Sequence, residues 1–454
     1  MTQALPLPSL EQASQRLHGG ETSSVQLTEQ ALARTMAGEG PKVFTRVFQG
    51  SALAEARASD TLRAAGLARS PIEGLPISVK DLFDIAGFPT LAGSRLLADA
   101  PPAQRTAEVV QRLRQAGAVI VGTTNMTEFA YSGLGLNPHY GTPRNPWQRD
   151  VDGGRIPGGS SSGAAISVTD GMAMAGIGSD TGGSVRIPSA FCGLTGFKPT
   201  ARRVSMQGVL PLSASLDSIG PLAPSVRCCA TLDAILSGEP LQELHAAPLQ
   251  GLRLLAPTNV VLDGMDAAVA AAWELALSRL SQAGAQVTHA VVQPFGELAE
   301  INAKGGFTAA EAWAWHRGYL ATRLDEYDPR VGTRILRGKD ISAADYIDLL
   351  ARRKHWIARV EAQLADHDAL IMPTVPVIAP KIAGLTASDE AYFGSNGLIL
   401  RNPTLINFLD GCAISLPCHQ AGEAPVGLSL AAAGGQDRRL LSMALAVEQL
   451  LAQD

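Results

Sequence analysis

Apolar positions along the chain repeat with a helical period and then pass into short apolar runs. The pattern over residues 106–116 predicts an amphipathic helix, Gly117 gives a stop signal, and the run at 118–121 predicts a strand. The same order recurs later, because a helical pattern over residues 269–283 precedes an alternating, strand-like pattern over 287–291. Helices that lead into strands through glycine stops are typical of crossover units, so these patterns predict an α/β fold with a largely parallel or mixed sheet.

Further segments fit the same fold class. Residues 23–26, Ser-Ser-Val-Gln, have the form of a capping box and predict an N-terminal helix. Apolar runs at 370–374 and 412–417 are ended by proline, which predicts two buried strands. The amphipathic pattern over 438–451 predicts a closing helix, and we interpret the helix-rich segment from about 225 to 365 as a cover over the sheet.

Length and composition leave the number of domains open. A chain of 454 residues exceeds the usual size of one domain. Hydrophobic residues make up 46% of it and no Pro/Ser-rich or charged linker interrupts it, so composition marks no boundary. One large α/β body and several lobes are therefore both compatible with these data.

Charge and cysteine content argue against several classes of protein. The net charge is −5 and the longest basic cluster covers only residues 352–354, so nothing indicates a nucleic-acid partner. The five cysteines are odd in number and lack a metal-binding spacing, which indicates reduced thiols in a cytoplasmic protein. Residues 1–6 form no positively charged leader and no long apolar run, so we expect neither secretion nor a membrane span.

A glycine- and serine-rich segment carries the main candidate chemistry. Eight of the 27 residues from 158 to 184 are glycine and six are serine, so this segment supplies little core and marks sharp bends or close approaches of the backbone. Two glycines precede Ser184, and backbone N–H groups freed by such glycines can form an oxyanion hole for acyl transfer. Ser184 is therefore a candidate nucleophile, with a tight turn as the alternative interpretation.

A nucleophilic serine needs a base, and Lys80 is the best-placed candidate. The eight histidines fit surface or core positions and none is suitably placed. Residues 75–80 alternate as a short strand that ends at Lys80, where burial favours the neutral amine. Half-neutrality at pH 7 requires the lysine pKa to fall from about 10.4 by about 3.4, equivalent to about 4.6 kcal/mol, which buried lysines reach. The alternative is a surface lysine paired with Asp81 or Asp84.

A second serine competes for the role of nucleophile. Residues 159–163 satisfy Gly-x-Ser-x-Gly, the nucleophile-elbow motif, in which Ser161 would attack. An elbow follows directly on a strand, but residues 150–157 have a loop-like composition. We therefore favour Ser184 over Ser161.

Together these motifs resemble the amidase signature family. The resemblance rests on Lys80-Asp81, the Gly-Gly-Ser-Ser run at 158–161, and the stretches 178–188 and 196–200. The interval of 24 residues between Ser160 and Ser184 also fits the family. Supporting stretches lie at 125–129, 215–221 and 425–428, so the similarity runs from about residue 20 to the end of the chain.

The resemblance implies a single domain over residues 1–454. Its fold would be α/β, with a large mixed, mainly parallel central sheet covered by helices on both faces. The signature core would occupy about 70–225, the helix-rich cover about 225–365, and the closing strands and helix about 366–454.

The resemblance also implies a catalytic triad and an oxyanion hole. Ser184 would accept the acyl group, Ser160, preceded by a cis peptide bond, would relay its proton, and Lys80 would be the neutral base. The oxyanion would be held by the backbone N–H groups of Thr181, Gly182, Gly183 and Ser184. This scheme needs no metal and no cofactor.

Other residues near these motifs are assigned supporting roles. We expect Asp180 and Arg186 to brace the loop by pairing with each other. By its position in the family, the loop with Tyr131 and Gly133 is expected to border the substrate. Ser162 stands where the family usually has a glycine, and its hydroxyl would reshape the relay loop or add to it.

The chain departs from the family pattern once more after residue 200. The family typically has Tyr-Gly-Arg there, whereas this chain has Ala-Arg202-Arg203, which removes an aromatic ring and adds a positive charge. If these arginines line the entrance, they favour polar or carbonyl-rich substrates. The alternative is that they are solvated loop residues.

These observations predict an amidohydrolase that cleaves linear C–N bonds of small or aryl amides. Carbamates and esters are further substrates, because the serine acts only on a carbonyl with a leaving group. We expect a monomer or homodimer with a small-molecule substrate and no nucleic-acid or membrane partner. The alternatives are a glutaminase-type component of an amidotransferase complex and a catalytically silent binding module.

Overall fold

One sheet of eleven strands organises residues 7–453, the part of the chain that the computed structural model describes. The strands are β1 Phe44–Val47, β2 Pro76–Lys80, β3 Val119–Thr124, β4 Ala175–Asp180, β5 Thr195–Lys198, β6 Ser218–Ala223, β7 Arg253–Pro257, β8 Gln286–Ala290, β9 Ala369–Pro373, β10 Cys412–Pro417 and β11 Gly427–Ala432. Their order across the sheet is β1-β3-β2-β4-β6-β5-β10-β11-β9-β7-β8. Residues 1–6, which carried the expectation about a leader segment, lie outside the described residues.

The sheet is mixed, as expected, but parallel pairs do not dominate it. β2 pairs in parallel with β3 and β4, and β7 pairs in parallel with β8 and β9. The other six pairings among the described strands are antiparallel, so the prediction of a mainly parallel sheet is wrong. Consecutive strands such as β10 and β11 are joined by a short loop without a helix, and a parallel pair would need a longer crossover.

Helices cover both faces of this sheet. The main ones are α1 Leu10–His18, α2 Ser24–Thr35, α4 Gln49–Ala64, α5 Glu108–Gln115, α6 Ser162–Thr169, α7 Arg186–Cys192, α8 Val226–Ser237, α9 Ala267–Gln282, α11 Gly306–Leu320, α12 Pro329–Leu336, α13 Ala343–Leu364, α15 Asp389–Phe408 and α16 Asp437–Leu451, and the shorter ones are α3 Gly40–Val43, α10 Leu298–Ile301 and α14 Ile382–Thr386. In β9, Leu370 belongs to the same buried cluster as Trp356 of α13, whereas the next residue, Ile371, belongs to the cluster that contains Leu440 of α16. Successive strand residues point to opposite faces, so each face has its own hydrophobic layer.

The elements predicted from local patterns are present at nearly the predicted positions. Ser23 caps α2 with the reciprocal bonds of a capping box to Gln26, and the strand predicted at 412–417 coincides with β10. The predicted helix–strand pairs correspond to α5 with β3 and α9 with β8. Local hydrophobic periodicity was sufficient for these elements because each is defined by its own face.

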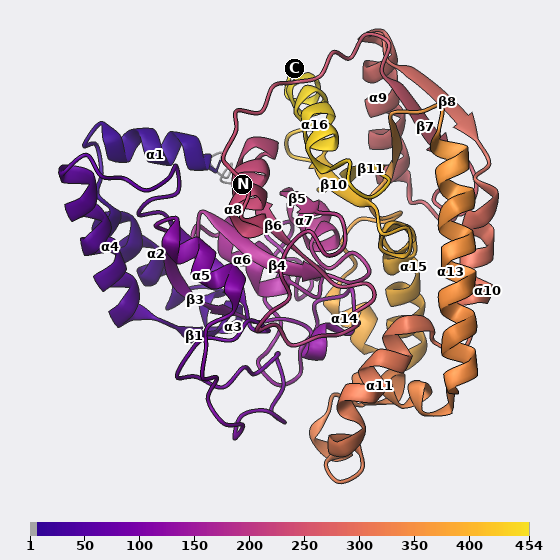
Figure 1. Ribbon diagram of the computed structural model, residues 1–454, viewed down its shortest axis with the longest axis horizontal. Helices are drawn as coiled ribbons and strands as arrows, with labels where there is room; N and C mark the ends of the chain where they lie inside the picture. The colour runs from indigo at the N-terminus through magenta and orange to yellow at the C-terminus, as the bar shows by residue number, and fades with distance from the viewer. Residues whose placement is uncertain (1–6, 454) are drawn as a thin grey trace.

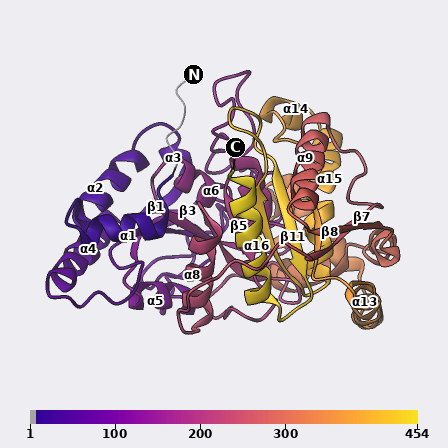
Figure 2. The ribbon, with the colours of Figure 1, turned by 90° about the horizontal axis from the view of Figure 1, so that it is seen from above.

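The two edges of the sheet are built from different parts of the chain. Figure 1 shows α2, α4 and α5 gathered around the edge formed by β1 and β3, and α9, α13 and α15 around the opposite edge with β7 and β8. The view from above in Figure 2 has the same two groups at opposite sides. The segment 225–365 therefore supplies two edge strands, β7 and β8, in addition to its covering helices.

Candidate active site

The candidate catalytic residues meet where two central parallel strands end. β2 ends at Lys80 and its parallel neighbour β4 ends at Asp180, so the residues that follow both strands lie at one edge of the sheet. Ser184 lies in the turn between β4 and α7, and Ser160 lies in the loop before α6. The carboxyl ends of adjacent parallel strands are a common place for ligand sites in α/β proteins.

Lys80 is completely buried and faces two serine hydroxyls. Its Nζ lies 2.7 Å from Ser160 Oγ and 2.8 Å from Ser179 Oγ. Burial lowers the pKa of Lys80 to about 7, and the negative charges of Asp180 and Asp217 act in the opposite direction. The alternative interpretation, a surface lysine paired with a carboxylate, is wrong because the side chain is 0% exposed and donates to hydroxyls.

The loop around Ser160 has the backbone that the family resemblance implies. The Gly159–Ser160 peptide bond is cis, and the Ser160 C=O accepts a hydrogen bond from Thr127 N–H at 3.1 Å. Ser161 N–H donates to the Ser184 C=O at 3.3 Å, which joins the two serine-bearing loops. Within residues 7–453, Ser184 Oγ makes no side-chain hydrogen bond, so its hydroxyl is available to a substrate. Such catalytic hydrogen bonds often tighten only when substrate is bound.

Ser184 opens onto a small cavity of about 190 Å³. Thr181, Gly182 and Ser184 form one side of it, and Tyr131, as expected, lies on its wall. The residues that complete the lining are Ala130, Ser132, Leu212, Leu216, Asn302, Gly305, Gly306, Phe307, Thr308, Arg334, Leu400, Thr404 and Phe408. The cavity is therefore mainly apolar, with backbone and hydroxyl groups on the Ser184 side.

The turn before Ser184 offers fewer free donors than expected. The Gly183 N–H donates to Asp180 Oδ1 at 2.8 Å, so we remove Gly183 from the expected oxyanion donors. In the described part of the chain, the N–H groups of Gly182 and Ser184 have no acceptor. Gly183 has φ +120°, and a Cβ there would lie 2.5 Å from Pro403 Cβ, so glycine is needed at this position to shape the turn.

A buried ion pair braces this turn from below, as expected. Arg186 Nη2 lies 2.9 Å from Asp180 Oδ1, and neither side chain is exposed. The same guanidinium group donates to Asn407 Oδ1 at 2.6 Å and to the Pro403 C=O at 3.0 Å, both on α15. The negative carboxylate also accepts from Val185 N–H at 3.1 Å, so Asp180 fixes both ends of the turn.

Three of the residues expected to bind substrate do not line this cavity. Gly133 lies behind its wall, where its N–H donates to Asn396 Oδ1 at 2.9 Å and its C=O accepts from Gly159 N–H. The Arg202 side chain is 71% exposed and pairs with Asp410, because the loop after β5 carries it to the surface. Arg203 pairs with Asp233 at 2.9 Å and with Glu239 at 2.6 Å. The expectations for Gly133, Arg202 and Arg203 are therefore wrong.

The cavity contains one charged residue that the sequence analysis missed. Arg334 of α12 lies with its guanidinium carbon 4.4 Å from the centre of the Tyr131 ring and donates to the Tyr131 C=O. Within residues 7–453 it forms no ion pair with a carboxylate. Its neighbours Val331 and Ile335 are buried, so the sequence shows an amphipathic helix there and no sign of a binding residue.

The nucleophile-elbow alternative does not fit the structure. Residues 150–157 contain no strand, and Ser161 Oγ is buried and lies 3.3 Å from the Ser179 C=O. Ser162, the departure from the family pattern, is the first residue of α6, and its Oγ lies 3.4 Å from the Asn125 C=O. Its hydroxyl therefore ties α6 to the loop after β3.

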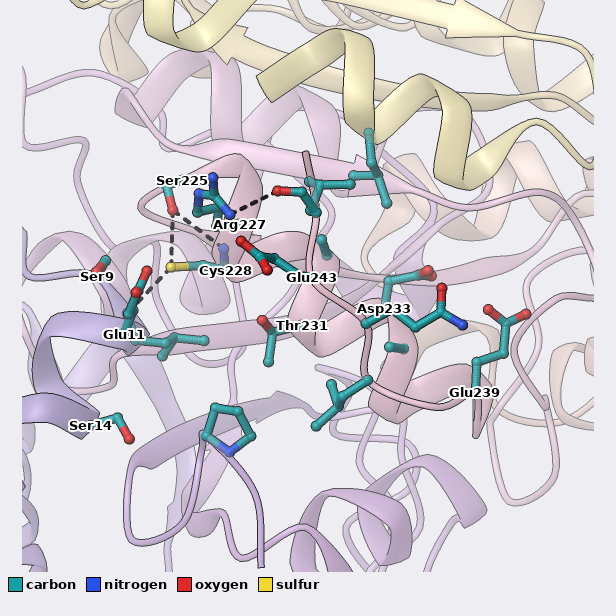
Figure 3. Close-up of a pocket in the computed structure, with 18 of the residues that line it drawn as sticks. Ser9, Glu11, Ser14, Ser225, Arg227, Cys228, Thr231, Asp233, Glu239 and Glu243 are labelled. Atoms are coloured by element: carbon teal, nitrogen blue, oxygen red, sulfur yellow. Dashed lines mark hydrogen bonds between the residues drawn. The ribbon is translucent and has the colours of Figure 1, made fainter. Parts of the chain in front are cut away.

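A larger cavity of about 840 Å³ lies away from the catalytic residues, between α1, α8 and residues 239–244 (Figure 3). Arg203 belongs to its lining, together with Arg227 and Asp233 of α8. Its charged groups already have partners, since Arg203 pairs with Asp233 and Arg227 donates to the Leu244 C=O. Size alone would have selected this cavity, but it has neither a nucleophile with a base nor free oxyanion donors.

Two other classes of site have no counterpart in the described residues. No group of three or more histidine, cysteine, aspartate or glutamate side chains is arranged to hold a metal ion there. The same residues include no helix whose length and apolar content would allow it to cross a bilayer. All five cysteines are free thiols.

Comparison with known proteins agrees with this geometry. The amidase family model matches residues 26–441. The chain is 37% identical to a 2-amino-5-chloromuconic acid deaminase of Comamonas testosteroni, over 98% of this chain and 96% of that protein. It is 34% identical to a glutamyl-tRNA(Gln) amidotransferase component from Chloroflexus aggregans, over 91% and 90% of the two chains. A crystal structure described as an amidase matches with a TM-score of 0.87 at 32% identity, over 97% and 99% of the chains. The chain therefore belongs to the amidase family and is a hydrolase of non-peptide carbon–nitrogen bonds.

Proposed function

We propose that the chain hydrolyses small amides through an acyl-enzyme on Ser184, with Ser160 as proton relay and Lys80 as base. The observation that carries this proposal is the contact of 2.7 Å between the fully buried Lys80 Nζ and Ser160 Oγ. A buried amine with a pKa of about 7 is substantially neutral near neutral pH and can accept a proton there.

The reaction then proceeds in two balanced halves. Ser184 Oγ attacks the carbonyl carbon, its proton passes to Ser160, and the proton of Ser160 passes to Lys80. The tetrahedral intermediate collapses as the relay returns a proton to the leaving nitrogen, so an amine or ammonia departs. Water attacks the resulting ester, gives its proton to the same relay, and releases the acid together with the free serine.

The oxyanion of each intermediate needs donors that are already in place. The N–H groups of Gly182 and Ser184 are free in the described part of the chain and border the cavity, and we add that of Thr181, which also lines it. Preorganised backbone donors stabilise the charge that develops in acyl transfer. Gly183 is excluded because its N–H already donates to Asp180.

The cavity favours a small substrate that carries a carboxylate. A volume of about 190 Å³ is below the range of sites for drug-sized ligands, so only a small aliphatic or single-ring group fits beside Ser184. Arg334 supplies a positive charge with no carboxylate partner in residues 7–453, and a guanidinium group pairs well with a carboxylate. The relative from Comamonas testosteroni is named for an acid substrate, which agrees with this assignment.

Carbamates and esters of the same shape are further substrates under this proposal. Ser184 requires only a carbonyl group and a leaving group, and the oxyanion donors do not distinguish nitrogen from oxygen as the leaving atom.

The alternative is a glutaminase-type component that supplies ammonia to a partner. The relative from Chloroflexus aggregans supports it by its name and its 34% identity. Free glutamine, however, carries an α-ammonium group beside its carboxylate, and the cavity lining includes Arg334 but no aspartate or glutamate. Since a buried ammonium group needs a partner, this cavity suits a carboxylated amide without an amino group better than it suits glutamine.

The test is a substrate panel with the purified chain alone. Small carboxylated amides, anilides, carbamates, esters and glutamine are assayed with the wild type, Ser184→Ala and the matched control Ser161→Ala. We expect hydrolysis of carboxylated amides without a partner, a loss of about 1,000-fold or more in Ser184→Ala, and retained activity in Ser161→Ala. Equal activity in Ser184→Ala and the wild type would contradict the proposal, and activity on glutamine alone would favour the alternative.

A further inference from the structure

One carboxylate links the catalytic turn to the opposite wall of the cavity. Asp217 immediately precedes β6, which pairs antiparallel with β4 so that Ser218 lies opposite Asp180. This register places Asp217 beside Thr181, whose Oγ1 donates to Asp217 Oδ1 at 2.5 Å. Asp217 is only 6% exposed, so the bond is shielded from water.

The other oxygen of Asp217 holds a second segment. Leu212 N–H and Ser213 N–H each donate to Asp217 Oδ2 at 3.0 Å. Leu212 and Leu216 line the cavity on the side opposite Thr181, so one side chain ties both walls together. A buried carboxylate with its oxygens satisfied in this way restrains the groups that donate to it.

The Thr181 end of the turn depends on this contact. At the other end, Asp180 accepts from Gly183 N–H and Val185 N–H, which fixes the segment that leads into α7. Thr181 is bound through its hydroxyl to Asp217, so the N–H groups of Thr181 and Gly182 take their position from this bond. The carboxylate does not itself reach the substrate, because it is absent from the cavity lining.

Asp217 also bears on the base electrostatically. Its negative charge favours the protonated form of Lys80 on β2, as does that of Asp180 on β4, which is neutralised by Arg186. From α11, the charge of Glu311 faces Asp217, and burial raises the pKa of Asp217 to about 6. Asp217 is therefore mainly ionised at neutral pH, where Lys80 works as a base.

We propose that Asp217 is a positioning residue with two separable roles: its hydrogen bond to Thr181 sets the oxyanion donors, and its charge strengthens Lys80 as a base. This inference rests on the proposed function of the same site. The two roles act through different neighbours, so two variants separate them.

Asp217→Asn removes the charge and can keep the architecture. Its amide oxygen can accept from Leu212 N–H and Ser213 N–H, while its NH₂ group donates to the Thr181 hydroxyl. Without the negative charge, Lys80 loses its proton more readily. The acid limb of log kcat/KM against pH is expected to move to lower pH by on the order of one unit. Asp217→Ser, which also lacks the charge and keeps an oxygen acceptor, is tested in parallel in case the asparagine variant does not fold.

Thr181→Val keeps the charge of Asp217 and removes the hydrogen bond. We expect kcat to fall by on the order of tenfold to a hundredfold, with KM and the midpoint of the acid limb nearly unchanged, because only the transition state uses the oxyanion donors. Thr181→Ser restores the hydroxyl and is expected to restore kcat. Thermal unfolding of each variant confirms that the compared samples are folded.

The results distinguish this inference from the function on which it rests. An unchanged acid limb in folded Asp217→Asn and Asp217→Ser would overturn the charge role, and full kcat in Thr181→Val would overturn the positioning role. Failure of the proposed function itself would appear in the wild type, as activity that survives Ser184→Ala.

Discussion

Asp180 and Arg186 form an ion pair with no exposure to solvent, directly under the turn that carries Ser184. The carboxylate binds the backbone of the turn, and the guanidinium group binds α15 through Asn407 and Pro403. The pair therefore joins the catalytic turn to a helix more than 200 residues further along the chain. It supports the site without lining the cavity.

Arg186→Met is expected to destabilise the protein by about 3 to 5 kcal/mol, because it leaves a buried carboxylate without its partner. The matched control is Arg202→Ala, which breaks an ion pair whose arginine is 71% exposed and should cost less than about 1 kcal/mol. Chemical denaturation of both variants measures the difference. Equal free energies of unfolding would show that the buried pair does not brace the fold.

The pH dependence of the reaction follows from the state of Lys80. The base must be neutral, and burial lowers its pKa to about 7. Below that pH the amine is protonated and cannot accept a proton, so kcat/KM is expected to fall tenfold for each pH unit on the acid side and to level off above about pH 8. The measurement is kcat/KM from pH 5 to 9 with a substrate that has no titratable group in this range. A flat profile would show that another group, or no base, is used.

The candidate catalytic residues were predictable from the sequence because each lies in a short contiguous motif. Lys80 ends a strand with a clear alternation, and Ser160 and Ser184 lie in loops whose glycine content is itself a signal. Arg334 was not predictable, because it reaches the cavity from α12 and its local pattern is that of an ordinary amphipathic helix. Arg202 was misplaced because proximity to a motif along the chain does not determine the direction in which a loop leaves the site.

The same distinction applies to the fold. The positions of β9 and β10 followed from local apolar runs that end at proline. Their direction relative to neighbours did not, because β10 pairs with β5 and β11, and the choice of these partners depends on the packing of the whole sheet. The expectation of mainly parallel pairing failed for this reason.

Arg334→Gln tests the assignment of the carboxylate site. A charge-assisted hydrogen bond to a charged group contributes about 1.5 to 3 kcal/mol, so KM for a carboxylated amide is expected to rise on the order of 10- to 100-fold. An uncharged amide of the same shape should lose nothing. Arg334→Lys is the control for charge, and it is expected to recover part of the loss, because lysine keeps the positive charge without the planar fork of donors. A similar loss for both substrates would mean that Arg334 supports the wall and does not bind the carboxylate.

Two adjacent glycines in the catalytic turn are expected to respond differently to alanine. At Gly183, φ is +120° and a Cβ would lie 2.5 Å from Pro403 Cβ and 2.7 Å from Ile187 Cδ1. At Gly182 the nearest contact of a Cβ is the Thr404 hydroxyl at 3.1 Å, and a small rotation of that side chain relieves it. Gly183→Ala should therefore destabilise the fold by at least about 1 to 3 kcal/mol and displace Ser184, whereas Gly182→Ala should leave the free energy of unfolding nearly unchanged.

Activity and stability measured on the same pair separate shape from chemistry. Gly183→Ala is expected to lose both, because the strained turn also carries the nucleophile and the Asp180 contact. Gly182→Ala keeps the fold, so any fall in its kcat reports on the oxyanion donor and the space beside it. A stable, active Gly183→Ala would contradict the close packing of this turn against α15, and with it the argument that the buried brace positions Ser184 from below.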